Sequence, residues 1–346
     1  MFQALPLPLS IEDISAEWLS EATGHAVNSA RVVEIIEGTS TKVRVAVEAE
    51  DLPETLIVKG GFESHSPSMA EMYANEARFY GRIAPVLPLP GPRCWFAGSD
   101  PTSFQSLVVI EDMDRANVAW LHGQRPQAPA AVARRLDVLA EFHASSWTDA
   151  GALPNSEFDW LGGRFSDWSM TYVERYLVAE VWDHYCRSPR GAAVSVRLHD
   201  REWMARAFTD FRRIEETGPR CIIHGDTHLG NLFEWPDGSP GFLDAQPARS
   251  NPILEVAYHI TAALDLADRR DAEHGLLAGY LAALAVRGIV PPTFDQAWLW
   301  YRQFTAYGFF IFLINETRFQ TEAVNTANAA RFGASMLDHQ VQELFG

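Results

Sequence analysis

Cysteine is scarce in this sequence, and its few copies are poorly placed for a disulfide framework or a zinc site. The three cysteines, Cys94, Cys186 and Cys221, are odd in number and show no CxxC spacing. A small disulfide-stapled fold is therefore unexpected, and a reducing compartment is favoured. We expect a cytoplasmic protein.

Long apolar runs are also missing. The most apolar stretch, FFIFLI at 309–314, is far too short to cross a bilayer and is typical of a buried helix. The first residues lack the basic start and apolar centre of a secretory signal. We therefore expect no membrane partner.

Positive charge is in short supply: 28 Lys and Arg residues stand against 45 Asp and Glu, which gives a formal net charge of −17. A field of this sign does not attract nucleic acid or an anionic membrane, so neither is expected as a partner. It weakly favours neutral or cationic substrates. The oligomeric state is left open.

The chain itself is long, because 346 residues exceed what one compact core usually holds. We expect two lobes, residues 1–113 and 114–346. Apolar runs and alternating patterns in the first lobe predict a helix at 68–84 and five strands, at 31–38, 42–50, 54–61, 94–98 and 105–113. The second lobe is predicted to be mostly helical, so the fold class is α+β.

The most informative stretch is CIIHGDTHLGNLF at 221–233. Three apolar residues typical of a buried strand are followed by two glycines and four polar side chains, those of His224, Asp226, His228 and Asn231. A second strand ends in FLD, at Asp244. If the two strands are neighbours, their loops can bring Asp226, Asn231 and Asp244 together.

Phosphoryl transfer needs this set of side chains. One carboxylate orients or deprotonates an attacking hydroxyl, while an amide oxygen and a second carboxylate hold Mg²⁺ against the nucleotide phosphates. The alternative is that Asp226 and Asn231 only cap turns, as Asp and Asn often do. The glycines, the strand context and Asp244 all fit one mechanism, which favours the first interpretation.

The spacing is similar to that of the protein-kinase catalytic loop and its metal-binding aspartate, with Gly225 in place of an arginine. In the form HGDxxxxN, it resembles the aminoglycoside phosphotransferase and choline kinase-like superfamily. Residues 224–260 look most like bacterial members of its ecdysteroid kinase-like branch. The resemblance implies a two-lobe, protein-kinase-like fold, with a small five-stranded antiparallel first lobe. It also implies transfer of the γ-phosphoryl group from ATP to a hydroxyl of a small molecule.

The resemblance assigns a role to each residue of the motif. Asp226 would be catalytic, and Asn231 and Asp244 would bind Mg²⁺. In the first lobe, Lys59 ends the third strand and would contact the nucleotide phosphates, held there by Glu76 on the following helix. Glu71 on the same helix is the competing partner of Lys59.

Two further nucleotide contacts rest on the resemblance. EGTSTKV at 37–43 stands where a nucleotide-covering loop belongs, and its hydroxyls and N–H groups at Thr39, Ser40 and Thr41 would face phosphate. It has one glycine, so the GxGxxG pattern is absent. The backbone from Glu111 to Met113 would bind the adenine edge.

The small molecule whose hydroxyl would receive the phosphoryl group, here called the acceptor, is the part of the function that the sequence determines least. The helical segment 149–220, rich in Trp and Tyr, is the expected acceptor region, although the spacing of its aromatic residues also fits helix core. Aminoglycosides, choline-like amines, hydroxylated sterols and hydroxyacyl thioesters are all compatible with the resemblance. The chain departs from the family pattern at Ala245, where an aromatic residue is usual. It also departs at Glu255 in LEVAY, where Asp is usual and would cap a helix better.

Several alternatives stay open. A protein kinase is disfavoured because HRD, DFG and APE are absent as such. A nucleotide-binding regulatory pseudoenzyme is the second alternative. The third is a metal-dependent hydrolase using His224, Asp226 and His228. By resemblance His224 would brace the loop, and the alternative is that it acts as a general base. His228 could face substrate or solvent, and His143 is expected to be a satisfied core histidine.

Overall fold

The computed structural model describes residues 5–149 and 156–345, and its contacts divide the chain into two compact units. The N-terminal unit is Met1–Ala119 with Phe233–Gln246, and the C-terminal unit is Trp120–Leu232 with Pro247–Gly346. Each unit is described by itself below. The predicted functional boundary after Met113 stays a prediction.

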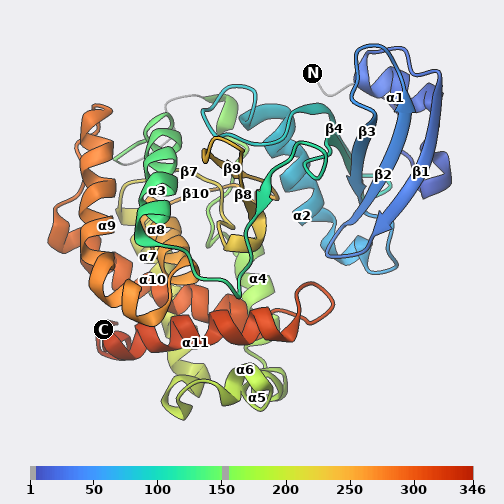
Figure 1. The fold of residues 1–346 in the computed structure, drawn as a ribbon. Helices are drawn as coiled ribbons and strands as arrows, with labels where there is room; N and C mark the ends of the chain where they lie inside the picture. Colours follow the sequence, from blue (N-terminus) through green and yellow to red (C-terminus); the bar gives the residue numbers. More distant parts are fainter. Residues whose placement is uncertain (1–4, 150–155, 346) are drawn as a thin grey trace. The chain divides into compact units, whose positions relative to one another are not determined.

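A five-stranded antiparallel sheet dominates the N-terminal unit, as predicted (Figure 1). Its strand order is β1-β2-β3-β5-β4, and each neighbouring pair runs antiparallel. The strands are β1 (Ser29–Ile36), β2 (Thr41–Glu48), β3 (Thr55–Gly60), β4 (Cys94–Asp100) and β5 (Gln105–Glu111).

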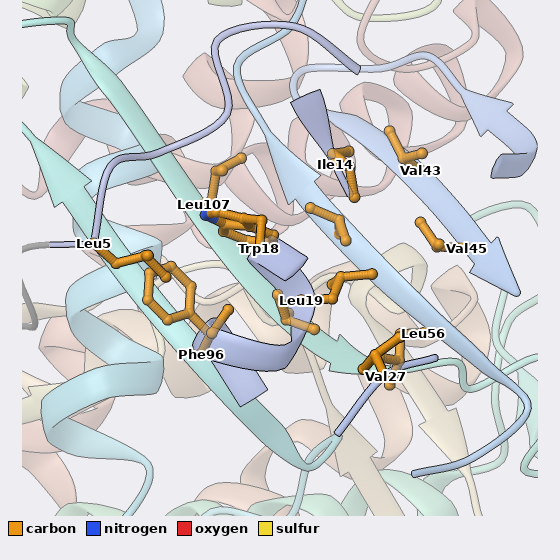
Figure 2. Packing of buried hydrophobic residues seen from close by; sticks show 13 residues of the cluster. Leu5, Ile14, Trp18, Leu19, Val27, Val43, Val45, Leu56, Phe96 and Leu107 are labelled. Carbon is orange, nitrogen blue, oxygen red and sulfur yellow. The ribbon is translucent and has the colours of Figure 1, made fainter. Parts of the chain in front are cut away.

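One face of this sheet packs on the first helix, α1 (Ala16–Thr23), which follows the short η1 turn (Ile11–Asp13). Figure 2 shows Trp18 and Leu19 of α1 among the strand side chains of this core. Val58 of β3 belongs to the same core. Because side chains alternate along a strand, its neighbour Lys59 lies on the opposite face of the sheet, paired in register with Val108.

Helix α2 (Ser66–Arg78) packs against β4 and β5 and continues as a π-helical turn, η2 (Phe79–Ile83). The side chains of Tyr73, Glu76 and Ala77 are buried on it. Glu76 is charged, and a buried charged side chain is unusual unless it has a partner of opposite charge.

The C-terminal unit is mostly helical, with α10 packed against α8 and α11, and α3 against α9 (Figure 1). Every residue of α8 is buried, so it is the central helix of this unit. The apolar stretch 309–314 lies within α10, where its side chains are buried or half-buried, as predicted. The α-helices are α3 (Pro129–Ala144), α4 (Asp167–Tyr176), α5 (Ala179–Cys186), α6 (Pro189–Ala192), α7 (Arg201–Thr217), α8 (Pro252–Ala263), α9 (Leu266–Val286), α10 (Phe294–Ile314) and α11 (Glu322–Asp338). Short 3-10 turns complete it: η3 (Ser156–Phe158), η4 (Val196–His199), η5 (Leu229–Asn231) and η6 (Val341–Glu343). Among residues 5–149 and 156–345, no helix has the length and apolar character needed to cross a bilayer.

Five short strands lie outside the large sheet, and four of them closely precede or follow the motif residues in the sequence. β7 (Cys221–Ile223) pairs with β10 (Ala248–Ser250), whereas β6 (Ala119–Trp120), β8 (Leu232–Glu234) and β9 (Pro240–Phe242) form a three-stranded sheet in the order β6-β8-β9. The strands that precede Asp226 and Asp244 are therefore β7 and β9, in different sheets. The two strands are therefore not hydrogen-bonded neighbours, which was the condition set for their loops to meet, because β9 pairs with β8 and β7 pairs with β10.

Candidate active site

The loop from His224 to Asn231, here named the catalytic loop, connects β7 to β8. Its two glycines have different structural reasons. Gly225 has φ +84°, a left-handed conformation that costs other residues energy. A Cβ at Gly230 would lie 2.8 Å from the His228 ring, so the missing side chain makes room for that imidazole.

Asp226 and Asn231 lie together in this loop. The Asn231 amide Nδ2 donates to the backbone oxygen of Asp226 at 3.0 Å and to its carboxylate Oδ2 at 2.9 Å. Because the amide nitrogen is used in this way, the carbonyl oxygen at the other end of the amide remains an acceptor suited to a hard cation. The Asp226 side chain is 32% exposed, so its carboxylate can meet an incoming substrate.

A tyrosine that sequence reasoning missed contacts the same carboxylate. Tyr258 of α8 donates its phenol hydroxyl to Asp226 Oδ1 at 3.0 Å. Burial, and then the charge of Asp226, raise the pKa of Tyr258 well above its usual value, so it stays a hydroxyl donor. The sequence feature that could have indicated Tyr258 is a polar side chain within an otherwise apolar helix that follows the HGD motif.

Glu255, also on α8, is bonded to the start of the catalytic loop. Its carboxylate accepts from the backbone N–H of His224 at 3.0 Å and from that of Gly225 at 2.6 Å, while His143 Nε2 lies 2.9 Å from Oε2. Burial opposes ionisation of this side chain. The hydrogen bond from His143 and the nearby histidines outweigh burial, so the pKa of Glu255 is lowered.

This geometry corrects the expectation that Glu255 is a weak helix cap. The N-cap of α8 is Asn251, whose side chain accepts from the Ile253 N–H at 3.0 Å. Glu255 lies one turn inside the helix and bonds to the loop instead. His143 is a fully buried core histidine that bridges Glu255 and the Tyr280 hydroxyl, which fits the sequence-based expectation.

Two more buried histidines brace the loop. His224 Nδ1 accepts from the Asp226 N–H at 3.3 Å, and His259 on α8 lies 2.9 Å from the Thr227 carbonyl through its Nδ1. The other ring nitrogen of His259 accepts from Arg135 at 3.2 Å. Burial, reinforced by the charge of Arg135, lowers the pKa of His259 to about 3, so the ring is neutral.

The hydrolase alternative finds little support in this geometry. His228 Nδ1 accepts from the Gly230 N–H at 3.0 Å, and its Nε2 lies 3.7 Å from Asp226 Oδ2. One ring nitrogen of each loop histidine, His224 and His228, is therefore used to hold the backbone. Within residues 5–149 and 156–345, no three His, Cys, Asp or Glu side chains are grouped so that they could hold a metal ion.

Three predicted residues meet in the N-terminal unit. Lys59 Nζ lies 2.6 Å from Glu76 Oε1 and 2.7 Å from Asp244 Oδ1, and Lys42 Nζ lies 3.8 Å from Asp244 Oδ2. Burial works to lower the pKa of Lys59, but attraction to Asp244 and Glu76 outweighs it and raises that pKa. Lys59 is therefore a buried, charged lysine between Glu76 and Asp244, while burial raises the pKa of Glu76 above its usual value.

The two helix glutamates have different partners. Glu71 pairs with Arg78 Nη1 at 2.7 Å, and both side chains are partly exposed. Glu76 is buried with Lys59. Of the two helix glutamates, Glu76 is the one that pairs with Lys59.

The backbone at Asp244 is strained. Asp244 has φ +58°, in the left-handed region that few residues other than glycine occupy and that Asp tolerates better than most. Strain of this kind is found disproportionately at functional sites. Two residues later, Gln246 Nε2 donates to the Met72 carbonyl of α2 at 3.3 Å, which ties this segment to the helix that carries Glu76.

The loop between β1 and β2 was expected to cover the nucleotide. The Thr39 carbonyl accepts from the Tyr73 hydroxyl and lies 3.1 Å from His65 Nε2, while the buried Thr41 hydroxyl donates to Glu63 at 3.1 Å. Ser40 lines a small recess together with Lys59 and Glu76. Of the three predicted hydroxyl residues, Ser40 is the one that lines this recess, and its contact with phosphate stays a prediction.

The expected adenine-binding segment follows β5. The Glu111 N–H already donates to the Arg93 carbonyl at 2.9 Å, so this group is not available to an adenine edge. The next residue, Asp112, is buried, and its carboxylate accepts from Arg44 Nε at 2.8 Å and from the Thr55 hydroxyl at 2.7 Å. The segment is thus fixed to β2 and β3.

Two features stand out among the aromatic residues of the expected acceptor region, whose residues 150–155 lie outside the described residues. Trp182 is buried and stacks on Phe310, as helix core does. Three half-buried tyrosines instead gather beside Glu316, whose Oε1 accepts from Tyr176 at 3.2 Å; they are Tyr172, Tyr176 and Tyr185.

Comparison with known structures places the fold among kinase-like phosphotransferases. A candidate aminoglycoside phosphotransferase from Ralstonia eutropha JMP134 is 16% identical, with a TM-score of 0.56 over 96% of this chain and 98% of that one. A choline kinase from Cryptosporidium parvum Iowa II is 11% identical, with a TM-score of 0.55 over 94% and 93%. APH(2")-IIIa in its complex with GDP and kanamycin is 14% identical, with a TM-score of 0.51 over 83% and 84%. These likenesses confirm the predicted two-lobe, protein-kinase-like α+β fold.

A search among curated proteins found no match. The model of the phosphotransferase enzyme family, APH, matches residues 31–297, which is more than half of the chain. The chain therefore belongs to the phosphotransferase enzyme family.

Proposed function

We propose that this protein is a small-molecule kinase that transfers the γ-phosphoryl group of ATP to a hydroxyl group. The observation that carries the proposal is the buried cluster of Lys59, Glu76 and Asp244. Lys59 and Asp244 stand far apart in the sequence, yet Lys59 Nζ lies within 2.7 Å of both carboxylates. A lysine held in this way can orient nucleotide phosphates without moving during the reaction.

The donor groups of two residues, each taken by itself, suit a magnesium ion. Asn231 presents a carbonyl oxygen, since its Nδ2 is bonded to Asp226, and Asp244 presents a carboxylate. Oxygen donors of this kind are what Mg²⁺ prefers. We propose that Asn231 and Asp244 hold Mg²⁺, which would neutralise charge on the β- and γ-phosphates. That they share one ion stays a prediction.

Asp226 is the proposed catalytic residue. Its partly exposed carboxylate would accept a hydrogen bond from the acceptor hydroxyl, orient it toward the γ-phosphorus and take its proton as the new bond forms. The buried contacts on the rest of the loop keep this carboxylate in place. Catalysis is then mostly positioning and charge neutralisation.

For the acceptor, we propose a neutral or cationic alcohol. The net charge of −17 favours such molecules over anions. Structurally similar proteins include a kanamycin complex and a choline kinase, so polar amino alcohols are the first class to test. We further propose a cytoplasmic protein without nucleic-acid or membrane partners.

The direct test is an ATP-consumption screen across amino alcohols, sterols and hydroxyacyl thioesters, repeated with GTP as donor. Asp226→Ala should reduce transfer by about a thousandfold or more while Mg·ATP binding persists, whereas Asp244→Ala should weaken Mg·ATP binding itself. Asp237→Ala, in the exposed turn after β8, is the control and should change neither.

Two outcomes would contradict the proposal. Near-normal transfer by Asp226→Ala would remove Asp226 from the chemistry. Binding of Mg·ATP without transfer to any alcohol would instead favour the regulatory pseudoenzyme.

A further inference from the structure

Tyr258 is a buried residue whose hydroxyl reaches the proposed catalytic carboxylate. We infer that Tyr258 is a positioning residue for phosphoryl transfer, which fixes the orientation in which Asp226 receives the acceptor hydroxyl. The inference rests on the proposed function. It adds a residue from α8, about one helical turn beyond Glu255, to the side chains that control the reaction.

The ring of Tyr258 packs among three other aromatic rings. It stacks on Phe312 of α10 with the ring centroids 5.7 Å apart and the planes 11° apart, and it lies 5.7 Å from the ring of Phe332 on α11. The Tyr307 ring is 6.1 Å away. All residues of α8 are buried, and the phenol hydroxyl of Tyr258 donates to Asp226 Oδ1.

The two oxygens of the Asp226 carboxylate are bonded from different sides. Oδ1 accepts from Tyr258 at 3.0 Å, and Oδ2 accepts from Asn231 at 2.9 Å. Terminal torsions of aspartate are soft, so one hydrogen bond alone leaves the plane of the carboxylate free to rotate. Two hydrogen bonds, one to each oxygen, fix the plane of the Asp226 carboxylate. They thereby set the direction of the lone pairs that the acceptor hydroxyl would meet.

A simpler explanation is that a buried tyrosine hydroxyl needs some partner, and Asp226 happens to be near. The same unit offers a matched control for this explanation. Tyr301 on α10 is also buried, and its hydroxyl donates to the carboxylate of Glu273 at 2.9 Å. Tyr301→Phe removes an equivalent bond that does not involve the catalytic loop.

The kinetic test compares wild type, Tyr258→Phe and Tyr301→Phe with Mg·ATP and two alcohol probes, kanamycin and choline, or a better alcohol from the screen. For Tyr258→Phe we expect kcat to fall about tenfold, with the KM for ATP changed less than about twofold. Placing 4-aminophenylalanine at position 258 retains a donor on the same ring and should restore most of kcat. A kcat for Tyr258→Phe within about twofold of wild type, or an equal loss in Tyr301→Phe, would overturn the inference.

A second measurement decides the case in which no alcohol is phosphorylated and the proposed function fails. Crystal structures of the three proteins under one condition show the carboxylate directly. We expect Asp226 to keep one orientation in wild type and Tyr301→Phe, and to rotate or split into two conformers in Tyr258→Phe. An unchanged carboxylate in all three would overturn the inference independently of any activity.

Discussion

Glu255 offers the sharpest perturbation of the site, because one atom can be changed without changing its shape. Its two carboxylate oxygens accept from the backbone N–H groups of His224 and Gly225, and Oε2 also bonds to His143. Glu255→Gln replaces one oxygen by an NH₂ group. Whichever way the new amide is turned, one backbone N–H of the loop then faces a donor instead of an acceptor.

The magnitude follows from that geometry. A buried N–H that loses its acceptor costs about 1–3 kcal/mol, and the remaining bonds lose the strength that the charged oxygen gave them. Since Glu255 is only 2% exposed, water cannot replace the lost acceptor. We therefore expect Glu255→Gln to lower the free energy of unfolding by about 3 kcal/mol. Glu255→Asp keeps the charge but shortens the side chain, and should give an intermediate loss.

The assay is hydrogen exchange of peptides covering 221–231, together with denaturant unfolding and turnover. Exchange at His224 and Gly225 should accelerate in Glu255→Gln, and kcat should fall because these residues position Asp226. Glu273→Gln is the matched control. Glu273 is a buried carboxylate bonded to Arg269 and Tyr301, so its loss should reduce stability without accelerating exchange in the catalytic loop. Unchanged protection of the loop in Glu255→Gln would refute the reasoning.

Two further predictions concern the backbone and the pH dependence of stability. Gly225→Ala forces a side chain into φ +84° and should cost about 1–2 kcal/mol, whereas Gly275→Ala in α9, where an added Cβ meets nothing within 4 Å, should stabilise the helix by up to about 1 kcal/mol; denaturant unfolding of both variants tests this. His259 binds its proton only near pH 3 when folded but near pH 6.5 when unfolded, so below pH 6.5 the unfolded state takes up the extra proton and stability falls, by at most about 1.4 kcal/mol per pH unit. His259→Gln should flatten this dependence between pH 7 and pH 5, and an unchanged slope would contradict the assignment.

The five-stranded sheet could be predicted because each of its strands can be recognised from its own residues. Alternation in β2 and the apolar run of β3 require no knowledge of distant residues, and both strands lie within two residues of their predicted ends. The pairing of β7 with β10 could not be read in this way. It depends on β8 and β9 forming their own hairpin, which is a competition between segments rather than a property of either one.

The residues of the candidate site also divide into those that local sequence identifies and those that depend on distant partners. Asp226 and Asn231 are recognisable because loop chemistry and glycines concentrate in eight positions, and Lys59 and Glu76 follow from strand and helix order. Glu255 can be recognised as a departure from the family pattern, but helix-capping preference predicts the wrong structural role for it. Its partners in the loop are backbone N–H groups, and such partners leave no trace in the residue types of the loop.

A single helix explains most of what was missed. Residues 255, 258 and 259 of α8 are spaced by three and four, so they share one face of a helix whose other residues are mostly apolar. Along that face Glu255 bonds to the start of the catalytic loop, Tyr258 to the Asp226 carboxylate and His259 to the Thr227 carbonyl. The half-buried tyrosines beside Glu316 belong to α4 and α5, different helices altogether. If those tyrosines meet the acceptor, its identity can change by substitution there while α8 continues to hold the catalytic loop unchanged.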